Sequence, residues 1–192
     1  KINFRSPKNL KSDEEFKIFK ELSADLAVVV AYGQLIPKVY LKTVKLGFIN
    51  VHASLLPKWR GAAPIQRAIM NGDKKIGVSI MKIEEKLDSG PVLATKEIEL
   101  GQNVTCGEVE KQLSVIGADL LIKSLKNIES GDIKFINQIH AEATYAKKID
   151  KNETKINWSL DANKVIAHIH GLSPNPGAWF EHENERFKVL RA

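Results

Sequence analysis

Apolar positions in the first third of the chain change their period several times, and each change predicts a new element. Phe16, Phe19 and Leu22 recur at helical spacing behind a capping-box pattern, whereas residues 26–31 form a continuous, mostly β-branched run. Such a run is typical of a strand buried on both faces of a sheet. The predicted order is helix 12–23, strand 26–31, helix 37–44, strand 47–51 and helix 62–70.

Longer elements follow. Two strand-like runs are separated by an acidic turn, and a second capping box opens a long amphipathic helix that places Val109 and Leu113 on its buried side. The pattern then loses its periodicity before a smaller unit with one helix and a hairpin. Helices alternating with buried strands predict a parallel, doubly wound α/β sheet. The predicted elements are strands 77–83 and 91–98, helix 105–130, helix 162–170 and hairpin strands 179–181 and 187–190.

The length and composition predict a globular chain in three parts. With 192 residues, 43% of them hydrophobic, it can form one full domain and part of another. We expect a catalytic domain over 1–130, a linker over 131–150 and the start of a second domain over 151–192. No apolar run approaches the roughly 20 residues that a membrane helix needs, and no signal peptide is visible. A single cysteine, Cys106, predicts no disulfide and a cytoplasmic location.

Positive charge is concentrated in one stretch. Residues 38–75 contain eight basic side chains and one acid within a chain of net charge +6. Such a stretch can attract phosphates or carboxylates, although scattered lysines are more often a solvated face.

The densest polar constellation lies around residue 50. Asn50 and His52 fall on one side of a predicted strand near its carboxyl end, where open α/β sheets bind ligands. Asp88 follows another strand and can reach the same crevice. Each residue alone is more often structural, as we expect for Cys106 and for the other histidines. The spacing of the other histidines, which are His140, His168, His170 and His182, predicts no metal site.

The combination of motifs resembles the folate-dependent formyltransferases. The segments NVHASLLP (50–57), GVSI (77–80) and LDSG (87–90) match the residues in which that family carries a catalytic Asn, His and Asp. The segments AYGQLIP (31–37), WRGAAPIQR (59–67), TYAKKI (144–149) and INWS (156–159) are similar to the members that formylate methionyl-tRNA.

The resemblance implies a fold and a truncation. We expect a Rossmann-like domain with a parallel-rich sheet, followed by the first part of an OB-like β-barrel that binds tRNA. Against that pattern the chain lacks the N-terminal part, at least one βαβ unit of about 30 residues, and the later strands of the barrel.

The implied reaction transfers a formyl group from 10-formyltetrahydrofolate to the α-amino group of initiator methionyl-tRNA, for translation initiation. In it Asn50 and protonated His52 donate hydrogen bonds to the formyl oxygen, and Asp88 keeps His52 charged and assists proton removal. No metal and no membrane are involved, and a monomer is expected.

The same resemblance implies binding residues. Any one apolar residue expected to contact folate is at least as often a core residue as a ligand contact. The expected folate site comprises Tyr32, Gly33, Leu35, Ile36, Ser54, Leu55, Leu56, Pro57, Glu85 and Leu87; the expected tRNA contacts are Lys58, Arg60 and Arg67.

Two alternatives stay open. One is a formyltransferase with another acceptor: a sugar-nucleotide amine, a purine-precursor amine or water. The other is a non-catalytic tRNA-binding fragment that uses the basic stretch. Against the second, residues 132–192 carry little basic excess and few aromatic side chains for base stacking.

Overall fold

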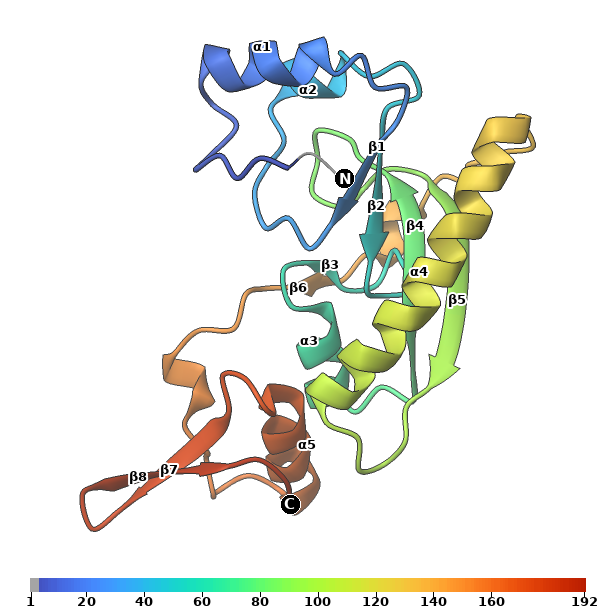
Figure 1. The fold of residues 1–192 in the computed structure, drawn as a ribbon. Coiled ribbons are helices and arrows are strands. Elements are labelled where there is room, and N and C mark those ends of the chain that lie inside the picture. The colour runs from blue at the N-terminus through green and yellow to red at the C-terminus, as the bar shows by residue number, and fades with distance from the viewer. Residues whose placement is uncertain (1–3) are drawn as a thin grey trace.

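A mixed four-stranded sheet forms the centre of the computed structural model, which describes residues 4–192 (Figure 1). Its order is β1-β2-β4-β5. β1 (Ala27–Val30) and β2 (Phe48–His52) are parallel, whereas β4 (Lys75–Lys82) is antiparallel to both β2 and β5 (Val92–Glu99). The expectation of a parallel-rich sheet is therefore wrong for the described residues. The nine residues between β4 and β5 are too few for the crossover that parallel strands require.

β1 differs from its expectation on one face. Ala27 and Val29 pack against a core formed around Tyr40, beneath α1 (Asp13–Glu21) and α2 (Lys38–Leu41). Val28 and Val30 point the other way and are 41% and 59% exposed. Burial on both faces was predicted, but in the described part of the chain β1 is an edge strand with one covered face.

The main core lies between the sheet and two helices. α4 (Cys106–Ser130) runs along β4 and β5 (Figure 1), and α3 (Pro64–Asn71) ends at Gly72 in the left-handed conformation. The capping box predicted for α4 is formed, because the Thr105 hydroxyl accepts from the Glu108 N–H and the Glu108 carboxylate accepts from the Thr105 N–H. The capping pattern thus predicted where α4 begins.

Cys106 occupies the first turn of α4 with its thiol in the main core. Burial, reinforced by the charge of Glu110, raises the pKa of the Cys106 thiol to about 12. Because only the thiolate reacts, we expect labelling of the folded full-length protein at about pH 8 to be on the order of 10³-fold slower than labelling in urea. Rapid labelling of the folded protein by a thiol reagent would contradict a purely structural role.

The C-terminal unit packs against α3. Its core includes Ile169 and Leu172 and is completed by Met70 of α3; a side chain on Gly171 would lie 2.6 Å from the Met70 side chain. The predicted hairpin is present as an antiparallel pair (Figure 1). The remaining elements are β3 (Arg60–Gly61), η1 (His140–Glu142), β6 (Tyr145–Ala146), η2 (Asn152–Thr154), α5 (Ala162–Leu172), β7 (Ala178–His182) and β8 (Glu185–Val189).

Candidate active site

Asn50 and His52 share one face of β2, two residues apart at its carboxyl end. His52 is only 5% exposed and lies opposite Ser79 of β4, whereas Asn50 is partly exposed. The continuous β2 hydrogen-bond ladder fixes both backbones, so the amide and the imidazole are presented by a rigid element. The prediction that Asn50 and His52 lie on one side of the strand is therefore confirmed.

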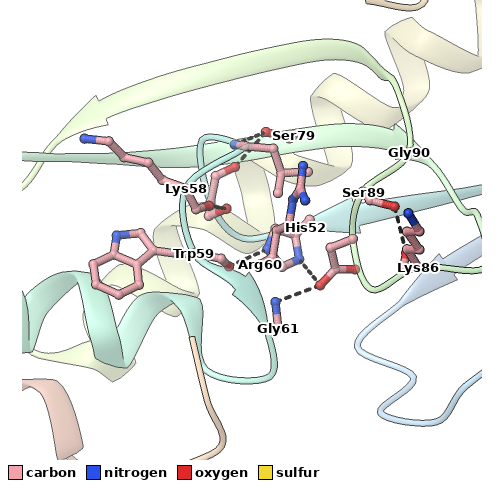
Figure 2. A network of polar contacts seen from close by, with 12 residues as sticks. His52, Lys58, Trp59, Arg60, Gly61, Ser79, Lys86, Ser89 and Gly90 are labelled. Atoms are coloured by element: carbon pink, nitrogen blue, oxygen red, sulfur yellow. Dashed lines mark hydrogen bonds and ion pairs between the residues drawn. The ribbon is translucent and has the colours of Figure 1, made fainter. Parts of the chain in front are cut away.

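The ring of His52 is oriented by the loop that follows β2. Nε2 lies 2.9 Å from the Trp59 carbonyl oxygen, and because a carbonyl only accepts, Nε2 donates this hydrogen bond (Figure 2). Nδ1 faces Asp88, 3.8 Å from Oδ2. That separation exceeds a direct hydrogen bond but keeps the carboxylate within ion-pair distance. Nδ1 is therefore the ring nitrogen available to a reacting molecule.

Two glycines let the loops that hold Asp88 approach closely. Asp88 Oδ2 accepts a hydrogen bond of 2.8 Å from the N–H of Gly61. Gly61 has φ +119°, and a Cβ there would lie 2.8 Å from the Ala146 carbonyl oxygen. A Cβ on Gly90 would overlap the Lys82 carbonyl. Larger residues would push both loops apart, so these glycines set the position of the carboxylate.

The segment expected to be a linker also holds the loop after His52. β6 pairs with β3, and Thr144 contacts the loop from both its backbone and its side chain. The Trp59 N–H donates to Thr144 Oγ1 at 2.9 Å, and the Arg60 N–H donates to the Thr144 carbonyl at 2.9 Å. Sequence reasoning missed this role, because a two-residue strand leaves no periodic signal.

Ser54, which was expected to contact folate, lies inside the loop that follows β2. Its side chain is fully buried, and its hydroxyl donates to the Lys58 carbonyl at 2.6 Å. Its own carbonyl accepts from Ser79 Oγ at 2.7 Å. Ser54 thus stabilises the loop from within, and its contact with folate stays a prediction.

The neighbouring apolar residues of the expected folate set lie in two places. Leu55 and Pro57 line a cavity of about 410 Å³ beside Trp59, which none of the three candidate catalytic residues lines. Leu56 is partly buried and donates its N–H to Ser79 Oγ at 3.2 Å. Their role in binding stays a prediction.

An ion pair joins the two other segments of the expected folate site. Lys38 Nζ lies 2.6 Å from Glu85, and this lysine lowers the pKa of the Glu85 carboxyl. The pair links the start of α2, which follows residues 31–36, to the acidic turn 84–88. Of the remaining residues, Ile36 packs in the Tyr40 core, whereas Tyr32, Gly33, Leu35 and Leu87 are exposed.

Neither arginine expected to contact tRNA faces solvent freely. Arg60 is 3% exposed; its Nε and Nη2 donate to Gln138 Oε1 at 3.0 and 2.7 Å. Arg67 donates to both carboxylate oxygens of Glu153, at 2.9 and 2.7 Å, and lowers the pKa of that carboxyl. Both guanidinium groups are hydrogen-bonded within the protein, and their contact with tRNA stays a prediction. Lys58 is exposed.

Residues 4–192 offer neither a metal cluster nor a membrane helix. No group of three or more His, Cys, Asp or Glu side chains in that range could hold a metal ion. None of the helices formed by these residues is long and apolar enough to cross a membrane.

Comparison with known proteins decides the family. Residues 3–125 match the model of the formyl transferase family, and residues 148–192 match that of the formyl transferase C-terminal domain. The chain belongs to the formyl transferase family. Methionyl-tRNA formyltransferases of Chelativorans sp. and Pelagibacter ubique are 49% and 48% identical to it, over 98% and 100% of this chain.

Solved structures show the same formyl transferase fold. A sugar N-formyltransferase from Shewanella sp. has a TM-score of 0.80 at 23% identity, covering 95% of this chain and 75% of its own. HypX from Aquifex aeolicus, solved in complex with tetrahydrofolic acid, has a TM-score of 0.78 at 19% identity, covering 91% of this chain and 31% of its own. The chain spans 62% of the length of the two curated relatives.

Proposed function

We propose that the full-length protein transfers the formyl group of 10-formyltetrahydrofolate to the α-amino group of initiator methionyl-tRNA, giving formylmethionyl-tRNA. The observation that carries this proposal is the near-50% identity to methionyl-tRNA formyltransferases along almost the whole chain. The clustering of His52 and Asp88 beside Asn50 supplies the groups that such a transfer needs.

The reaction forms one C–N bond and breaks another. The amine of methionyl-tRNA attacks the formyl carbon, whose oxygen becomes negatively charged. When the carbonyl re-forms, the bond to the folate nitrogen breaks, and the proton given up by the attacking amine is returned to that leaving nitrogen.

Asn50 and His52 stabilise the charge that develops on the formyl oxygen. The Asn50 amide donates one hydrogen bond, and protonated His52 donates a second from Nδ1, since Nε2 is committed to the Trp59 carbonyl. Donors held rigidly before the reaction cost no reorganisation as charge appears, and one such donor is worth about 10²–10³ in rate in a well-studied case.

Asp88 has two tasks in this mechanism. Its carboxylate, 3.8 Å from His52 Nδ1, places a negative charge beside the imidazole that binds the formyl oxygen. It also accepts the proton of the attacking amine, directly or through a water molecule. The hydrogen bond from the Gly61 N–H keeps Oδ2 in place for both tasks.

The substrates are assigned to different parts of the chain. We place the pterin between residues 31–36 and 84–88, which the Lys38–Glu85 ion pair joins. Residues 151–192 begin an OB-like barrel that contacts tRNA, and the protein acts as a monomer in the cytoplasm without a metal.

Exposed lysines in the basic stretch give a test of the tRNA assignment. Replacing Lys42, Lys45 and Lys58 by glutamine in the full-length protein should raise KM for methionyl-tRNA and lower the salt slope of binding by about one for each phosphate that is no longer neutralised. Kinetics at several salt concentrations measure both. Lys126→Gln on α4 is the matched control. If the salt slope of tRNA binding is unchanged in the triple variant, the basic stretch is a solvated face that does not contact tRNA.

The acceptor is tested by comparing formyl transfer from 10-formyltetrahydrofolate to methionyl-tRNA, to sugar-nucleotide amines and to a purine-precursor amine. We expect methionyl-tRNA to be formylated much faster than the other amines. Faster formylation of a different amine would identify that amine as the acceptor instead. Binding of tRNA without transfer to any acceptor would favour the non-catalytic alternative.

A further inference from the structure

Gln138 is a buried side chain that connects the expected linker to the candidate active site. It is 8% exposed, and every hydrogen-bonding position of its carboxamide is occupied. Nε2 donates to the carbonyls of Asp88 and Gly90, at 2.9 and 2.6 Å. Oε1 accepts from Nε and Nη2 of Arg60, at 3.0 and 2.7 Å.

The chemistry of the partners permits only one orientation of this amide. A guanidinium only donates and a backbone carbonyl only accepts, so exchanging the amide oxygen and nitrogen of Gln138 would mismatch all of these hydrogen bonds. A carboxylate at this position could bind Arg60 but could not donate to the two carbonyls. The site therefore selects a side chain that accepts on one side and donates on the other.

Arg60 is buried beside Gln138, and among residues 4–192 no carboxylate pairs with it. Its guanidinium is held by Gln138 Oε1 and by His140 Nδ1, at 3.0 Å from Nη2. A buried positive charge without a counterion is costly unless its donors are satisfied. Its N–H groups fix the Gln138 oxygen, and this directs the amide N–H groups toward the turn at residue 88.

That turn adopts a conformation that needs support. Asp88 has φ 44°, in the left-handed region that residues other than glycine rarely occupy. Its carboxylate is held by the Gly61 N–H, but its backbone is held by Gln138 through the carbonyls on either side of Ser89. Without the amide donors, the carbonyls of Asp88 and Gly90 would lose this partner and the turn would be free to relax.

We propose that Gln138 is a positioning residue for formyl transfer, acting through the backbone of the Asp88 turn to place its carboxylate against His52. The inference rests on the proposed function. It makes the segment before β6 part of the active-site support, although it lies about 50 residues beyond Asp88 in the chain.

Gln138→Glu in the full-length protein tests this directly, because it keeps an acceptor for Arg60 and removes both donors to the turn. We expect kcat to fall about 10–100-fold while KM for folate and for methionyl-tRNA changes less than about twofold. We also expect faster amide hydrogen exchange at Gly61 and in residues 84–90. Gln112→Glu, on the exposed side of α4, is the matched control.

Gln138→Met, of similar size, provides the same comparison should the carboxylate prevent folding. Wild-type kcat together with unchanged exchange in residues 84–90 would overturn the proposal, as would a rise in both KM values with kcat preserved. If the wild-type protein forms no formylmethionyl-tRNA, the proposed function fails. The exchange measurement then still decides whether Gln138 holds the turn.

Discussion

Replacing Asn50 by alanine in the full-length protein is expected to lower kcat for formyl transfer about 10²–10³-fold, with folate affinity nearly unchanged. The amide is proposed to bind an oxygen that carries full charge only in the transition state, so its removal affects the chemical step more than binding. Rapid-quench kinetics with saturating substrates measures the step, and fluorescence titration measures folate affinity.

Asn127→Ala is a suitable control for the Asn50 variant, because Asn127 is exposed on α4. The control should keep wild-type kcat. If Asn50→Ala also keeps it, the amide has no part in the mechanism, whatever its place on β2.

Removal of His52 and removal of Asp88 are expected to be strongly non-additive. The two side chains lie 3.8 Å apart, and in the proposed mechanism Asp88 acts partly through the imidazole that binds the formyl oxygen. We expect His52→Ala or Asp88→Ala alone to lower kcat on the order of 10²–10⁴-fold, and the double variant to be little worse than the more severe single variant. The three variants assayed together give the coupling.

Independent action would give a different result in that double-variant cycle. If the two reductions in kcat simply multiplied, His52 and Asp88 would contribute separately, and Asp88 would not act through the imidazole. If one single variant lost most of its kcat and the other kept wild-type kcat, His52 and Asp88 would not act as a pair.

Local signals in the sequence predicted the elements well. The capping residues Ser12 and Thr105 predicted where α1 and α4 begin, because caps satisfy backbone groups within a single turn. The carboxyl end of β2 was predicted as the place of Asn50 and His52 from strand alternation alone. Asp88 was expected in the same crevice because it follows another strand, and its carboxylate lies 3.8 Å from His52 Nδ1 in the structure.

Features set by contacts between distant segments could not be predicted. Burial of Arg60 depends on Gln138, 78 residues away, and the partly exposed Arg67 is held by Glu153. The sequence pattern around a basic residue does not show whether its side chain is exposed or lies in a buried hydrogen-bond network. The antiparallel direction of β4 likewise depends on sheet pairing, which the apolar pattern does not encode.

Asn50, His52 and Asp88 are proposed to transfer a formyl group to methionyl-tRNA. Single-turnover transfer of labelled formyl from 10-formyltetrahydrofolate, by the full-length wild-type protein and by its His52→Ala variant, tests this role. We predict rapid formation of formylmethionyl-tRNA by the wild type, and a rate at least about 10²-fold lower in the variant at equal folate occupancy. Equal rates in the two proteins, or no transfer by the wild type, would contradict the claim.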